Sequence, residues 1–147
     1  MKKQVGVVVL LVAASLLSFG KRDETIEQLI ARAEAAPPQQ QSDLFLEVAE
    51  RELKLATEVF KADKREEGRT ALDQIVKYSD KAHSAAIASR KRIKHTEIKL
   101  RQISGRLRDI KMNVDFDDQA QVQATIGKLE DFRSELLKSM FGSKNND

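Results

Sequence analysis

Two histidines are the residues best suited to metal binding or to acid–base catalysis near neutral pH, because imidazole titrates in that range and ligates metals. His83 and His95 lie twelve residues apart, which in a helix directs their side chains about 120° away from each other. They do not have the i,i+4 spacing of a helical zinc site. Asp80 and Ser84 are neighbours of His83 in sequence only, whereas a catalytic triad is defined by geometry. We therefore expect neither a metal site nor a triad.

Other catalytic and cofactor-binding patterns are also missing from the sequence. It contains no cysteine, which excludes disulfides, thiolate catalysis, cysteine-ligated zinc and iron–sulfur clusters. It contains no glycine-rich phosphate loop. No acidic residue stands in an apolar run that would raise its pKa and suit it to acid–base catalysis. The sequence predicts a protein that is not an enzyme, binds no cofactor and has no small-molecule substrate.

The strongest charge pattern is a basic segment, residues 90–111, with nine lysines and arginines against Glu97 and Asp109, a net charge of +7. Residues 43–67 hold eight acids and five bases, a net charge of −3. The basic segment is a candidate surface for an anionic partner, such as nucleic acid, phospholipid headgroups or an acidic protein. The alternative is a solvated helix face that neighbouring acids partly balance. The nine candidate residues are Arg90, Lys91, Arg92, Lys94, Lys99, Arg101, Arg106, Arg108 and Lys111.

The N-terminus disfavours nucleic acid as the partner, because residues 1–20 have the three-part pattern of a secretory signal peptide. Lys2 and Lys3 precede an uncharged apolar stretch, residues 5–19, and the small residues Ser18 and Gly20 occupy the −3 and −1 positions of a cleavage site after Gly20. The stretch is shorter than the ~20 residues that a membrane-spanning helix needs, although an uncleaved anchor in the inner membrane is the alternative. We expect the rest of the chain to be periplasmic or extracellular. Aromatic platforms for bases are also lacking, since Phe45, Phe60 and Phe132 occupy core positions.

Helices must position these side chains, because apolar residues recur at threes and fours along the chain after residue 22. Thr25 and Gln28 have the spacing of a capping box, and Ser42 is a suitable N-cap for a second helix. Between these helices, proline disfavours helical geometry in the residue before it, so residues 37–41 are expected to be a linker. The helices predicted around the longest segment span residues 23–36, 43–62 and 117–140.

The longest segment runs from residue 66 to residue 111 and has no proline. Its apolar residues keep helical spacing throughout, and we predict one continuous helix about 65–70 Å long. Asp63 and Glu66 have capping-box spacing and predict a tight turn before it. Ser104-Gly105 is the weakest point, because glycine costs about 1 kcal/mol relative to alanine in a helix.

The predicted fold class is all-α, an elongated bundle of about four helices in antiparallel hairpins on this long central helix. Residues 21–141 are expected to form a single domain, followed by a frayed polar tail at 142–147. The predicted function is a non-catalytic protein-interaction, scaffold or chaperone-like factor in the bacterial envelope. Its partner would be another protein or a second copy. The alternative is a membrane-anchored or membrane-surface protein whose basic helix contacts anionic headgroups.

Overall fold

The computed structural model describes residues 24–142, which form an all-α bundle. This confirms the predicted fold class. Five helices and no strand occur in that range: α1 (Ile26–Ala35), α2 (Pro38–Lys61), α3 (Arg65–Ser89), α4 (Ile93–Asn113) and α5 (Phe116–Phe141). None of these helices is long and apolar enough to cross a bilayer. The predicted signal peptide or anchor and residues 143–147 of the predicted tail lie outside the described residues.

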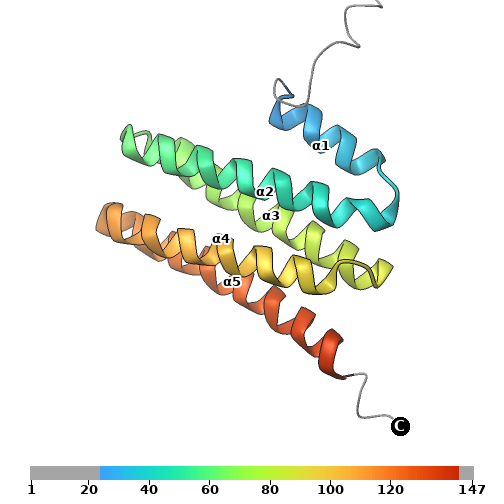
Figure 1. Cartoon of the computed structure of the whole chain (residues 1–147). Helices are drawn as coiled ribbons and strands as arrows, with labels where there is room; N and C mark the ends of the chain where they lie inside the picture. The colour runs from blue at the N-terminus through green and yellow to red at the C-terminus, as the bar shows by residue number, and fades with distance from the viewer. Residues whose placement is uncertain (1–23, 143–147) are drawn as a thin grey trace, which may run out of the picture.

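Two antiparallel hairpins, α2–α3 and α4–α5, pack side by side to make the bundle (Figure 1). The main contact between them is α3 against α5, whereas α2 and α4 touch less extensively. Helix α1 packs on α2 from outside (Figure 1). The predicted antiparallel hairpins are confirmed, because α2 packs against α3 and α5 packs against α4.

Each helix contributes one apolar face to a shared core, as the spacing of the apolar residues predicted. Burial of a leucine or isoleucine side chain contributes about 1.5–3 kcal/mol, so these faces hold the hairpins together. The largest fully buried apolar side chains are Leu29, Leu53, Leu72, Ile75, Leu100, Ile103, Leu107, Leu129 and Leu136.

The predicted continuous helix over residues 66–111 is wrong. Helix α3 ends at Ser89, and α4 begins at Ile93 after a sharp reversal. Arg90 and Arg92 adopt left-handed backbone conformations, with φ of 55° and 63°. Such a conformation costs a residue with a side chain about 1–2 kcal/mol.

The reversal is favourable because it lets the apolar face of α4 contact three helices. In a straight helix this face would pack against the last helix alone, whereas α4 packs against α5, α2 and α3. The hydroxyl of Ser89 accepts a hydrogen bond from the Lys91 N–H at 3.2 Å and so satisfies one exposed backbone group. Gly105, the predicted weak point, lies inside α4.

The predicted helix ends are partly confirmed. The Thr25–Gln28 capping box is present, with hydrogen bonds of 3.0 and 3.1 Å between each side chain and the other residue's N–H. The predicted N-cap at Ser42 is wrong, because α2 already begins at Pro38. Proline suits the first position of a helix, where its fixed φ is helical and its missing N–H has no role. Ser42 is buried inside α2.

The predicted capping box at Asp63 and Glu66 is also wrong, because Asp63 terminates α2. Its φ is 59°. The N–H of Lys64 donates to the carbonyl of Val59 at 2.8 Å, and the N–H of Asp63 donates to the carbonyl of Phe60 at 3.1 Å. These two bonds form a Schellman motif. The predicted short turn is present, but it is formed by the C-terminal motif of α2 and not by a cap at the start of α3.

Candidate functional site

The nine basic candidate residues do not form one surface. Arg90, Lys91 and Arg92 occupy the α3–α4 turn. Residues spaced by seven lie on the same face of a helix, so Lys94, Arg101 and Arg108 share one face of α4. On the other side of α4, Lys99 and Arg106 line hollows beside α2. Lys111 reaches α5.

Four of the nine have a polar partner on another helix. Arg92 lies 3.1 Å from Asp43, Lys99 lies 3.1 Å from Glu50, and Arg108 lies 3.2 Å from Glu130. Lys111 donates to the side-chain oxygen of Gln123 at 2.8 Å. The side chains of the other five have no ion pair with any residue in 24–142. These unpaired basic residues are Arg90, Lys91, Lys94, Arg101 and Arg106.

A groove of about 650 Å³ lies between α2 and α4, and we call it the α2–α4 groove. It follows residues 47–61 of α2 and 106–114 at the end of α4, and a second hollow, of about 710 Å³, extends it toward Lys99. Its apolar lining comes from both helices and comprises Leu53, Phe60, Ile110 and Val114. Its rim carries both signs of charge, and five of its charged side chains form no ion pair within the part of the chain described. They are Lys54, Glu58, Lys61, Arg106 and Asp109.

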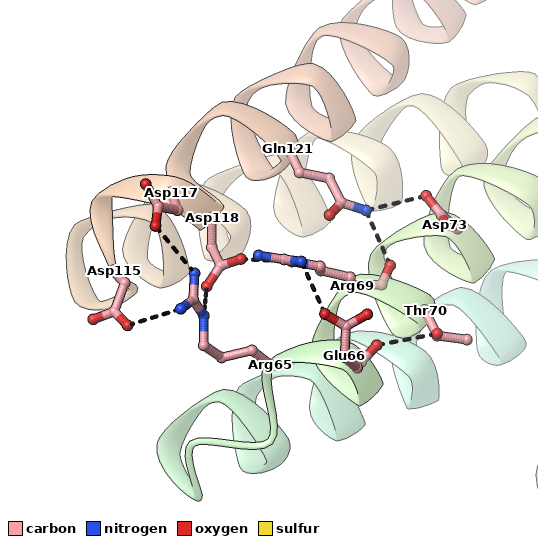
Figure 2. Close-up of polar contacts among 9 residues, drawn as sticks. All are labelled: Arg65, Glu66, Arg69, Thr70, Asp73, Asp115, Asp117, Asp118 and Gln121. Carbon is pink, nitrogen blue, oxygen red and sulfur yellow. Dashed lines mark hydrogen bonds and ion pairs between the residues drawn. The ribbon is translucent and has the colours of Figure 1, made fainter.

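A cluster of charged side chains joins the starts of α3 and α5, as Figure 2 shows. The carboxylate of Asp118, 1% exposed, accepts hydrogen bonds from the Nε atoms of Arg65 at 2.7 Å and Arg69 at 2.8 Å. The hydrogen bond from Arg65 has the largest effect on the Asp118 pKa, which lies below its ordinary value even though burial acts in the opposite direction. Asp115 precedes α5 as its N-cap, but its side chain makes no capping hydrogen bond.

This cluster is structural, because both of its arginines pair with Asp118 of the other hairpin. Arg65 also lies 3.7 Å from Asp115 and 3.8 Å from Asp117. The side-chain amide of Gln121 donates to the backbone carbonyl of Arg69 at 3.1 Å (Figure 2). The arrangement fixes the position of α5 on α3, and both of its arginines are paired with carboxylates.

The two histidines lie on different helices. The His83 ring, buried in α3, stacks on Phe132 of α5 with centroids 5.1 Å apart. Its Nε2 lies 2.7 Å from a carboxylate oxygen of Glu135, without the alignment of a hydrogen bond. His95 lies 3.7 Å from Asp43. Among residues 24–142, no group of three or more His, Cys, Asp and Glu side chains could hold a metal ion.

The expectation that no acid has a raised pKa is wrong for Glu52. This residue is 7% exposed, and burial, followed by the negative charge of Glu27, raises its pKa. The sequence did contain a signal. Phe45, Val48, Leu55 and Val59 form an apolar row on α2, and residue 52 occupies the gap in that row at helical spacing.

No family model, curated protein or solved structure matches the chain. The function of the chain must therefore be inferred from the geometry of the bundle. A groove with an apolar lining and unpaired charges of both signs can bind an amphipathic segment of a protein.

Proposed function

We propose that this chain is a non-catalytic protein-binding factor, of the scaffold or chaperone-like kind, that acts in the bacterial envelope. In this proposal the α2–α4 groove binds an amphipathic helix of a partner protein. The proposed export depends on the signal-peptide pattern of residues 1–20. The observation that carries the binding proposal is the apolar lining of the groove between two charged helix edges.

The dimensions and charges of the groove support this mode of binding. An amphipathic helix places its apolar face in a hydrophobic groove and its polar faces on the rim. The groove follows residues 47–61 of α2, about 20 Å at 1.5 Å per residue, which is room for several turns of a helix. Lysine and glutamate occur on the α2 edge, and arginine and aspartate on the α4 edge. A mixed rim of this kind would select the direction of the bound helix, because like charges oppose the reversed orientation.

Substitution of Thr57 by arginine tests the proposal, since Thr57 lines the groove on α2. A photo-crosslinking side chain at Asn113, on the α4 edge, should capture the partner in cells. Thr57→Arg should reduce this capture at least tenfold, about 1.4 kcal/mol, because the long charged side chain covers the apolar lining. Ala124→Arg, at an exposed position on α5, is the control and should leave capture unchanged. Equal capture in both variants would contradict the proposal.

A membrane surface is a second candidate, favoured by the five unpaired basic residues. Each lysine or arginine near an anionic membrane contributes about 1 kcal/mol. Vesicles containing phosphatidylserine should bind the protein at low salt and release it as salt rises. The triple substitution Lys91→Glu, Lys94→Glu and Arg101→Glu should abolish binding, whereas Lys128→Glu on α5 should not. Absence of binding at low salt would exclude this candidate.

A further inference from the structure

A second groove, of about 480 Å³, lies between α1 and α3 on the opposite face of α2. Glu27, Glu52, Glu66 and Glu67 line it, together with apolar side chains that include Ile26, Ile30 and Leu55. No lysine or arginine lines it. We call it the acidic groove. It differs from the α2–α4 groove in carrying one sign of charge.

Glu52 is the distinctive residue of the acidic groove. Its side chain is more than nine-tenths buried and lines the groove. It has neither a hydrogen-bond nor an ion-pair partner in the range 24–142, although glutamate is almost never this buried unless it is paired. Glu27 and Glu67 form no ion pair in that range either, whereas Glu66 lies 2.9 Å from Arg69. The groove thus offers several carboxylates to a cationic group from outside the bundle.

A complementary basic element exists on the same molecule. Arg90 and Lys91 in the α3–α4 turn and Lys94 on the first turn of α4 are exposed, and they belong to the unpaired basic residues. Arg90 and Arg92 have left-handed backbone conformations in this turn. Some 20 residues of α3 separate the turn from Thr70 in the acidic groove, about 30 Å along the helix. The turn therefore cannot reach the groove of its own chain.

We propose that the acidic groove binds the basic α3–α4 turn of a second copy of this chain. The cationic ends of the side chains pair with Glu52 and Glu67, and their aliphatic parts pack on Ile26, Ile30 and Leu55. Residues 24–142 contain equal numbers of acidic and basic side chains, so net charge does not oppose association. The two surfaces differ, so the contact is head-to-tail and extends into open chains or closes into rings. This inference does not depend on the α2–α4 groove.

Two double variants each disrupt one of the two surfaces of this contact. Glu52→Gln with Glu67→Gln removes charge from the groove and leaves the turn intact. Lys91→Glu with Lys94→Glu reverses charge on the turn and leaves the groove intact. The wild-type protein recovered from cells should form concentration-dependent oligomers in sedimentation velocity at low salt. Each double variant should associate at least tenfold more weakly. An equimolar mixture of the two should form dimers and nothing larger, because one functional groove and one functional turn remain.

Matched controls and folding checks keep the test decisive. Asp131→Asn and Lys128→Glu, both at exposed positions on α5, should associate as the wild type does. Glu52→Gln should fold normally, because burial already favours the neutral carboxyl. A wild-type protein that stays monomeric at low salt would overturn the proposal, even if the groove bound a free basic peptide. Mixed variants that fail to form dimers would overturn it as well.

Discussion

Replacement of Asp118 by asparagine should lower the free energy of unfolding by about 1.5–3 kcal/mol, the range for hydrogen bonds to charged groups. Asp118 is 1% exposed and accepts from both Arg65 and Arg69. A neutral amide loses the charge attraction and presents a donor to one of the guanidinium groups. Because both arginines lie on α3 and Asp118 lies on α5, the loss weakens the contact between the two hairpins. Urea unfolding at pH 7 measures it.

Asp117→Asn is the matched control, since it removes the same charge one residue earlier. Asp117 has a side chain that is 78% exposed and lies 3.8 Å from Arg65. Exposed ion pairs contribute about 0–1 kcal/mol, so this variant should unfold close to the wild type. Equal destabilisation by the two substitutions would show that burial of the Asp118 carboxylate has no special role.

The destabilisation by Asp118→Asn should depend on pH in a defined direction. The arginines hold the pKa of Asp118 below its ordinary value in the folded protein. In the unfolded chain the pKa returns to about 3.9. The charged pair therefore contributes its full stability above that value and loses it as the pH falls through the lower, folded-state pKa. The difference between wild type and variant should be constant from pH 7 to about pH 5 and should shrink in more acidic solution.

The helices themselves could be predicted from the sequence because period and capping are local properties. Leu46, Ile75, Leu107 and Leu129, which stand at predicted apolar positions, are all buried, and the Thr25 cap forms as expected. The reversal at Arg90 could not be predicted in this way. It uses neither glycine nor proline, and the packing of α4 against three other helices offsets its strain.

The candidate sites could be predicted from the sequence less completely than the fold. The α2–α4 groove joins residues about 50 positions apart in sequence, and no local pattern specifies the spacing of the two helices. The basic segment was visible, but its division into paired and unpaired residues depends on the acids of α2 and α5. Glu52 could have been detected from the sequence, because it lies at helical spacing between the apolar residues Val48 and Leu55.

Replacement of Gly68 by valine should destabilise the protein by about 1–3 kcal/mol, the usual effect of an overpacked interior. A Cβ atom at Gly68 would lie 2.6–2.7 Å from three ring atoms of Phe60. Gly68 is buried near the start of α3, and Phe60 lies near the end of α2, so the close approach fixes the α2–α3 turn. Valine is stiff about χ1 and cannot rotate its methyl groups away freely. Thermal or urea unfolding measures the effect.

Gly127→Val on α5 is the control, because a Cβ there meets no atom within 4 Å. Valine has a helix propensity a few tenths of a kcal/mol better than that of glycine, so this variant should be as stable as the wild type or slightly more so. Phe60 also lines the α2–α4 groove. Displacement of its ring by Gly68→Val should therefore reduce partner capture at Asn113, whereas Gly127→Val should not. If the two variants unfold alike, the ring of Phe60 can move without loss, and the tight contact at this turn does not stabilise the hairpin.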